Sequence, residues 1–251
     1  MSKVVLDIKN LSLSFKSQQA VNQVLFGVSY KLQKNEILGV VGESGSGKSV
    51  SSLAVLGLLP RKNTMFNSGE ILFKDHNLLD YKNEDFRKLR GHKIAMIFQE
   101  PMTSLNPSLT CGKQVVEILQ EHLGLSTSEA KEEVLSLFEK VKLPNPEVIY
   151  SKYPHQISGG QKQRVMIAMA IACKPDVLIA DEPTTALDVT VQKEIIALLK
   201  DIQQETGMSI IFISHDLSLI SEISDRVVVM YKGTIVEQGH VSEVFHNPQH
   251  E

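Results

Sequence analysis

The most restrictive feature of this 251-residue chain is the segment GESGSGKS at residues 42–49. It follows the apolar run EILGVV and leads into a stretch that favours a helix from about residue 47 to residue 58. A glycine-rich turn between a buried strand and a helix aims several backbone N–H groups, and the positive end of the helix, at one point. The pattern therefore predicts a loop that binds the phosphates of a nucleotide.

The residues of this loop have separate expected roles. We expect Lys48 to reach the terminal phosphates and Ser49 to ligate Mg²⁺. The remaining predicted phosphate contacts are Gly42, Glu43, Ser44, Gly45, Ser46 and Gly47. The alternative is a serine-glycine loop with no ligand, and the strand before it and the helix after it argue against that alternative.

A second candidate segment, VLIADEP, places two carboxylates after an apolar strand. The carboxyl ends of strands are where α/β sheets bind ligands. We expect Asp181 to hold Mg²⁺ through its water shell and Glu182 to accept a proton from the attacking water. An ordinary pair of solvated helix-capping charges is the alternative.

Two further polar residues follow apolar runs. His215, after SIIFIS, is a candidate to contact the γ-phosphate or the water, whereas Ser214 and Asp216 are also plausible N-caps for the next helix. Gln99 ends KIAMIF and carries an amide oxygen that suits a metal ion. Taken alone, residues of these two types are more often polar surface residues than functional ones.

The segment ISGGQKQR, residues 157–164, raises a different question. Ser158 and Gln161 have the spacing of a capping box at the start of an apolar helix. The same helix end is an anion receptor, because its N–H groups and dipole both point outward. This chain already has one predicted binding site for a triphosphate, the loop of residues 42–49. We therefore expect the second anion-binding site to serve an ATP held by another subunit.

Composition narrows the function classes. The chain has 26 basic and 29 acidic residues, which argues against bulk attraction to nucleic acid or anionic lipid. Its two cysteines, Cys111 and Cys173, have no metal-ligand spacing and are expected to be reduced, packed thiols, as in the cytoplasm. No apolar run is long enough to cross a bilayer and no signal peptide is apparent, so we expect neither export nor a membrane span.

The order of the expected elements indicates an α/β fold. Four short strands open the chain, a mostly helical stretch covers about residues 112–172 with breaks at KLPNPE and YPHQ, and strands then alternate with helices. Alternation of this kind predicts a parallel sheet with crossover helices. The helical stretch reads as an insertion into that sheet.

Six motifs together resemble the ATP-binding subunits of ATP-binding cassette transporters. They are GESGSGKS, Gln99, ISGGQ, VLIADEP, ALD at residues 186–188 and SH at residues 214–215. The resemblance implies the P-loop NTPase fold of the ABC ATPase, a mixed sheet core with an antiparallel β-subdomain and an inserted helical subdomain. It implies one nucleotide-binding domain over residues 1–251, with the core at about 1–110 and 175–251 and the helical subdomain at about 111–174.

The resemblance also implies partners and roles. In that family two such domains pack head to tail around two ATP molecules. Each phosphate loop faces the partner's signature loop, which is ISGGQ, residues 157–161, in this chain. By this comparison Ser158, Gly159, Gly160 and Gln161 contact the partner's γ-phosphate and Asp188 lies in the loop that crosses the dimer. Glu182 becomes the general base and His215 the switch histidine. Phe15 is a candidate to stack on adenine, although a core-facing phenylalanine fits the position as well.

A narrower resemblance points to the oligopeptide, dipeptide and nickel importer branch. It is carried by FQEPMTSLNPSLT, YPHQISGGQKQRVMIAMAIA and DEPTTALDVTVQ. In that branch the loop after the glutamine meets the membrane permease subunits, and a solute-binding protein and those permeases select the cargo. The proline-rich loop suits an exposed connection. The partner ATPase is a second subunit or the second half of a tandem protein, and the cargo, peptide or nickel, is not encoded here.

Two departures from the family pattern stand out. The signature begins with Ile157 where leucine is commoner, a swap expected to be harmless. The chain ends at HNPQHE, inside a segment that relatives usually extend, so we expect either a short subunit or part of a longer protein.

Other function classes fit less well. A DNA-repair relative would carry zinc-binding cysteine pairs or a long heptad coiled coil, and a translation-associated relative would carry two cassettes in one chain. A non-catalytic regulator would lack Glu182 or His215, and a GTPase would carry an N-K-x-D motif. The prediction is therefore an importer ATPase on the cytoplasmic face of the membrane that uses ATP and Mg²⁺, and an ABC-type ATPase outside transport is the alternative.

Overall fold

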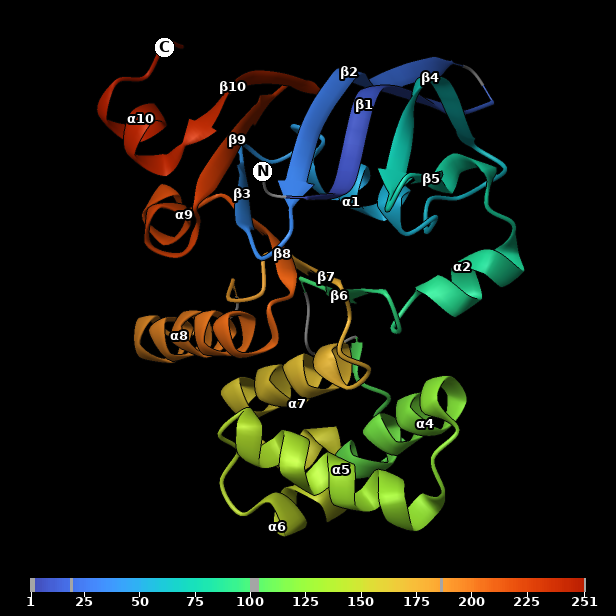
Figure 1. The fold of residues 1–251 in the computed structure, drawn as a ribbon, viewed down its shortest axis with the longest axis vertical. Helices are drawn as coiled ribbons and strands as arrows, with labels where there is room; N and C mark the ends of the chain where they lie inside the picture. The colour runs from blue at the N-terminus through green and yellow to red at the C-terminus, as the bar shows by residue number, and fades with distance from the viewer. Residues whose placement is uncertain (1–2, 19, 100–103, 186, 251) are drawn as a thin grey trace. The chain divides into compact units, whose positions relative to one another are not determined.

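The structure, a computed structural model, describes residues 3–18, 20–99, 104–185 and 187–250. The chain divides into two compact units, Met1–Arg87 with Gly207–Glu251, and Lys88–Thr206. The two ends of the chain therefore belong to one unit, drawn from blue to teal and from orange to red in Figure 1, and the middle of the chain forms the other.

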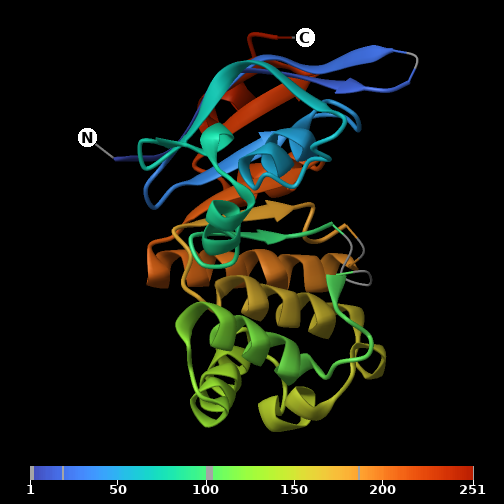
Figure 2. The same ribbon diagram turned by 90° about the vertical axis from the view of Figure 1, so that its right-hand side faces the viewer.

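The first unit contains an antiparallel sheet with the strand order β2-β1-β4-β5. Its strands are β1 (Val4–Lys16), β2 (Val21–Gln33), β4 (Thr64–Phe73) and β5 (His76–Asn77). The two opening strands expected from the sequence are one strand, β1, which continues through a register shift between Ile8 and Leu11. In Figure 2, β1 and β2 run together along much of their length. The expected antiparallel β-subdomain is confirmed.

The same unit contains a run of strands in the order β10-β9-β3-β8. The strands β3 (Ile37–Val41), β8 (Ser209–Ser214) and β9 (Arg226–Tyr231) are parallel, and β10 (Thr234–His240) returns antiparallel to β9. Every residue of β3 and β8 is buried, which is typical of parallel strands covered on both faces. Helix α9 (Leu217–Ile223) packs on β3 and β8, and α1 (Lys48–Val55) follows β3 in the chain. The predicted parallel sheet is confirmed.

The second unit joins two parallel strands to a set of helices. The strands β6 (Ile94–Ile97) and β7 (Val177–Asp181) pair in parallel. The helices are α4 (Cys111–Leu123), α5 (Thr127–Lys140), α6 (Pro146–Ser151), α7 (Gly159–Ile171) and α8 (Val189–Thr206). Figure 1 shows α4, α5, α6 and α7 packed together as one group. Between α6 and α7 lies the short η2 (Pro154–Gln156).

Several elements differ from the sequence expectation. The helical stretch has the two expected breaks and a third at Gly124, which ends α4 in the left-handed conformation. Helix α1 ends at Val55, earlier than residue 58, and η1 (Leu78–Asp80), α2 (Asn83–Leu89) and α10 (Val241–His246) were not predicted. Across the described part of the chain, none of the helices combines the length and the apolar character that a bilayer crossing requires.

Candidate functional site

The phosphate loop of residues 42–49 connects the buried strand β3 to helix α1. Its tip, formed by Glu43, Ser44 and Gly45, is exposed, whereas Lys48 is only 6% exposed. The Lys48 Nζ donates to the carbonyl oxygens of Gly42 and Glu43 at 2.6 and 2.9 Å. The ammonium group therefore lies back across the loop, next to the exposed backbone that would receive phosphates. Ser49 is the second residue of α1.

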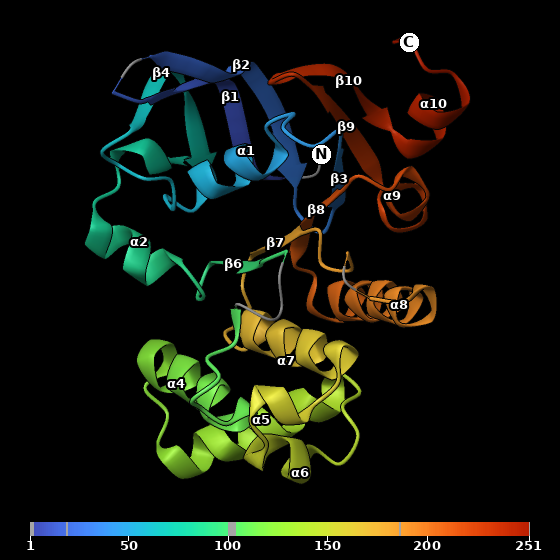
Figure 3. The same ribbon diagram turned by 180° about the vertical axis from the view of Figure 1, so that it is seen from behind.

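The neighbouring strands of the first unit hold this loop in place. The N–H of Ser46 donates to the carbonyl of Glu43 at 3.2 Å, and the N–H of Gly233, in the turn between β9 and β10, donates to the carbonyl of Ser46 at 3.1 Å. Helix α1 lies beside the antiparallel sheet in Figure 3. The hydroxyl oxygens of Tyr30, on β2, and Ser51, on α1, lie 3.4 Å apart. Burial raises the pKa of Tyr30 to about 12.

His215 follows the strand next to the phosphate loop. Val41 of β3 pairs with Ser214 of β8 in parallel register, so the loop and His215 leave the same edge of the sheet. The carboxylate of Asp216 caps α9 by accepting from the N–H groups of Ser218 and Leu219 at 2.8 and 3.4 Å. Of the two candidate caps, Asp216 is thus the one used. His215 is exposed at the sheet edge.

Phe15 lies near the end of β1, opposite Asn22 of β2 and Thr64 of β4. It is partly exposed and is not among the buried core residues of the first unit. A side chain in this position has a ring surface available to a ligand. The expected stacking on adenine stays a prediction.

In the second unit, the parallel pairing of Ile97 with Ala180 brings Gln99 and Glu182 to the same end of β6 and β7. The Gln99 Nε2 donates to Glu182 Oε2 at 3.0 Å. The hydroxyl of Thr185 donates to the same carboxylate oxygen at 2.9 Å. Asp181 is the last residue of β7 and is 6% exposed. The two predicted residues Gln99 and Glu182 thus meet, and Thr185 is a contact that the sequence reasoning did not include.

The backbone of Glu182 is unusual. Its φ is 46°, in the left-handed region that residues with a Cβ rarely adopt. Conformations of this kind cost about 1–3 kcal/mol and gather at active sites, where the surrounding structure enforces them. The carboxylate of Glu182 also accepts from Gln99 and Thr185, so its backbone and its side chain are both held in a set orientation.

Mg²⁺ prefers oxygen ligands and retains several waters. The three residues predicted to hold it supply a hydroxyl, a carboxylate and an amide oxygen, from Ser49, Asp181 and Gln99. The Gln99 amide nitrogen is turned to Glu182, so the amide oxygen is the atom that would ligate the metal ion. The donor set therefore fits this metal ion.

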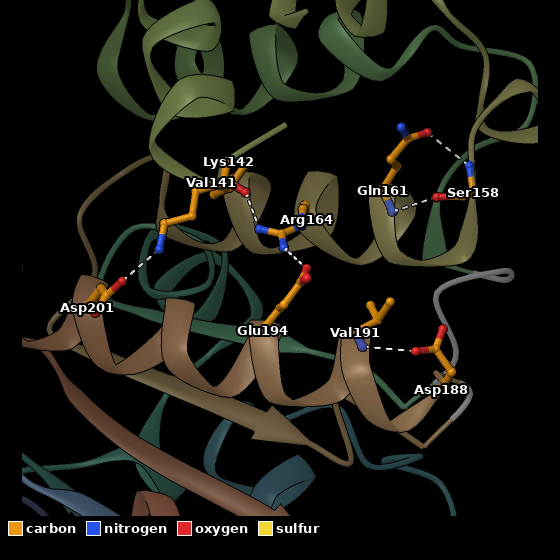
Figure 4. A network of polar contacts seen from close by, with 9 residues as sticks. All are labelled: Val141, Lys142, Ser158, Gln161, Arg164, Asp188, Val191, Glu194 and Asp201. Atoms are coloured by element: carbon orange, nitrogen blue, oxygen red, sulfur yellow. Dashed lines mark hydrogen bonds and ion pairs between the residues drawn. The ribbon is translucent and has the colours of Figure 1, made fainter. Parts of the chain in front are cut away.

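The signature segment forms the start of α7, and its predicted capping box is confirmed. Ser158 Oγ accepts from the N–H of Gln161 at 3.3 Å, and Gln161 Oε1 accepts from the N–H of Ser158 at 3.0 Å (Figure 4). Ser158 and Gly159 are exposed, whereas Ile157 is buried at 8% exposure. The apolar Ile157 thus anchors the loop while the polar residues after it face outward.

Asp188 lies just before α8. Its Oδ1 accepts from the N–H of Val191 at 3.0 Å (Figure 4), so the residue expected in the crossing loop also caps α8. Asp188 and Val189 are exposed, Val189 to 67%. Of the loop predicted to meet the membrane subunits, Glu100 to Thr103 lie outside the described residues, as does Ala186 of the ALD motif.

The phosphate loop after β3 and the acidic pair at the end of β7 define a P-loop nucleotide-binding protein of the α/β class. The sequence model of the family described as ABC transporter matches residues 25–185. The chain therefore belongs to the ABC transporter family, and it is an ATP-binding, ATP-hydrolysing subunit of that family.

Individual relatives agree with this assignment. The oligopeptide transport ATP-binding protein OppD of Bacillus subtilis is 49% identical over 98% of this chain and 69% of that protein. The glutathione import ATP-binding protein GsiA of Salmonella typhimurium is 47% identical over 99% of this chain and 41% of that protein. A dimeric, post-hydrolysis structure of the ATP-binding cassette MJ0796, bound to ADP and Pi, matches with a TM-score of 0.82 and 28% identity over 94% of this chain and 98% of that chain.

Proposed function

We propose that this chain is the ATPase of an importer for peptides or a similar small solute. It works on the cytoplasmic face of the membrane, with permease subunits that receive cargo from a solute-binding protein. The similarity to OppD and GsiA, which carry peptide and glutathione transport in their names, supports this solute class. The nickel alternative within the same branch keeps the same mechanism with a different cargo.

The observation that carries the proposal is the start of α7. Ser158 and Gly159 are exposed, and the capping box fixes the loop at the N-terminal end of α7, where the helix dipole is positive. We propose that this loop closes on the γ-phosphate of an ATP held by a second ATPase, either another subunit or the second half of a tandem protein. The dimeric structure of MJ0796 supports such an arrangement.

Within one site, the residues of this chain divide the work. Gly42 to Ser49 bind the phosphates of ATP, with Lys48 on the terminal phosphates. Glu182 accepts the proton of the attacking water, and Gln99 and Thr185 orient its carboxylate. His215 contacts the γ-phosphate or the water. Mg²⁺, held by Ser49, Asp181 and Gln99, would neutralise charge on the phosphate oxygens.

Binding of two ATP molecules supplies the free energy that closes the two ATPases on each other, because each ATP contacts both partners only in the closed state. The test is Glu182→Gln, which keeps the side-chain shape and removes the base. This variant should bind ATP, lose turnover by about 10²-fold or more and accumulate as an ATP-dependent dimer. Turnover close to the wild-type rate would remove Glu182 from its proposed role.

A further inference from the structure

Arg164 occupies an unusual position six residues after Ser158. It lies on α7 and is 9% exposed, although a charged side chain is rarely buried without partners. Its Nη1 donates to the carbonyl of Val141 at 2.8 Å, and its Nη2 donates to Glu194 Oε2 at 2.8 Å (Figure 4). One guanidinium therefore links three segments, namely α7, the end of α5 and the middle of α8.

The two contacts are made by two different nitrogens of the planar guanidinium. Val141 is the C-cap of α5, and its carbonyl accepts from the buried guanidinium. Glu194 lies on α8 with a side chain that is 56% exposed, so the ion pair is buried on the arginine side and hydrated on the other. Lysine, with a single ammonium group, cannot reproduce a planar fork that binds a carbonyl and a carboxylate together.

A second contact joins α7 to α8 nearer the signature loop. A Cβ added to Gly160 would lie 2.8 Å from Cγ1 of Val191, closer than real Cβ atoms come to a neighbour. The backbone of α7 thus approaches α8 at Val191, the same residue whose N–H is capped by Asp188. The signature loop and the loop carrying Asp188 are joined at this point.

Two contacts therefore join α7 to α8, and we call this pair of contacts the brace. Gly160 and Val191 contact each other at the signature end, and Arg164 and Glu194 pair one turn further along. We propose that Arg164 is a positioning residue that fixes the signature loop and the Asp188 loop as one rigid surface for the partner's ATP. This inference rests on the proposed function, since it assigns Arg164 a role at a site that the partner completes.

Arg164 should affect binding of the ATP held by the partner, and not binding of the ATP held by its own chain. Loss of the brace lets α7 shift against α8, and misplacement of about 1 Å at a phosphate-binding loop is enough to weaken binding strongly. The phosphate loop of residues 42–49 belongs to a different compact unit and keeps its own contacts. ATP affinity of the separate chain should therefore stay unchanged while assembly around ATP weakens.

The test uses the Glu182→Gln chain as background and measures two quantities. One is the affinity of the dilute chain for a fluorescent ATP analogue, and the other is ATP-dependent assembly, by sedimentation, with itself or with the companion ATPase that co-purifies with it. Adding Arg164→Lys should raise the dissociation constant of the assembly about tenfold or more and change the nucleotide affinity by less than about twofold. Because Glu194 is mostly exposed, Glu194→Gln gives a second variant that should fold normally and weaken assembly in the same direction.

Asp201→Asn is the matched control. Asp201 is also on α8, and it pairs with Lys142 at 2.8 Å, but both side chains are about 60% exposed. Exposed pairs contribute little, so this variant should assemble like the background. If the background assembles and Arg164→Lys and Glu194→Gln assemble as tightly as Asp201→Asn, the inference is wrong while the proposed function stands. If the background does not assemble with ATP, the proposed function fails and the inference falls with it.

Discussion

The N–H of Gly233 donates to the carbonyl of Ser46 at 3.1 Å, which ties the turn between β9 and β10 to the phosphate loop. Gly233 has a φ of +81°, and a Cβ there would lie 2.1 Å from the carbonyl oxygen of Val24. A side chain at this position must therefore move the turn, and the turn must then release or drag Ser46. The phosphate loop depends on a residue almost two hundred positions away in sequence.

Gly233→Ala should lower ATP affinity about tenfold or more, because the loop loses a support that sets its backbone N–H groups. Titration calorimetry with ATP measures this directly. Gly124→Ala is the control, since Gly124 also has a positive φ, +66°, but a Cβ there meets no atom within 4 Å. Gly124→Ala should lose about 1 kcal/mol of stability from the backbone conformation, and Gly233→Ala should lose more, because its Cβ also meets the carbonyl oxygen of Val24. Equal ATP affinity of the two variants would contradict the support role of Gly233.

The hydroxyl of Thr185, 2.9 Å from Glu182 Oε2, gives a second prediction. Thr185→Val keeps the side-chain volume and removes the donor, so the Glu182 carboxylate loses a contact that orients it. Turnover should fall by about tenfold with little change in ATP affinity, and Thr185→Ser should restore most of it. Steady-state kinetics over a range of ATP concentrations separates these effects. If only KM for ATP rises and the turnover number is unchanged, Thr185 contributes to ATP binding instead.

Phe15 carries a prediction about the base of the nucleotide. If its partly exposed ring stacks on adenine, Phe15→Leu should weaken ATP binding by about 1 kcal/mol, and Phe15→Tyr should keep it. Fluorescence titration of the purified variants measures both affinities. If the Phe15→Leu chain binds ATP as tightly as the wild-type chain, Phe15 does not stack on adenine and the adenine contact belongs to another residue.

The two cysteines are free and buried, and burial raises the pKa of Cys111 to about 11 and raises that of Cys173. A raised thiol pKa keeps the protonated form through neutral and mildly alkaline pH, and the thiol reacts far more slowly than the thiolate. At pH 8 both residues should therefore react slowly with a thiol reagent in the folded chain and rapidly after denaturation. Fast labelling of the native chain would show that one of them is accessible.

The sequence predicted most of the elements because local signals were strong. The apolar runs of β3, β7 and β8 and the helix α8 match their predicted ranges within a residue or two. Ser158 and Gln161 formed the capping box that their spacing indicated. A signal for the missed break after α4 was also present, since Gly124 ends the helix and Ser126 forms a second capping box with Glu129.

The features that escaped sequence reasoning depend on residues distant in the chain or on backbone conformation. The contact between Gly233 and Ser46 and the link from Arg164 to Val141 and Glu194 arise only when the chain has folded. The positive φ of Glu182 opposes the local preference of glutamate, so no propensity could indicate it. Helix α2 is short, and its apolar residues Phe86 and Leu89 give too little periodicity for a prediction.

The most direct test of a shared active site is the turnover number of the wild-type chain over a dilution series, with sedimentation at each concentration. The series is run with the chain alone and with any companion ATPase that co-purifies with it. Turnover per chain should fall as the ATPases separate, because Ser158 to Gln161 of one chain complete the site of the other. Undiminished turnover by a chain that sediments as a monomer would contradict the account.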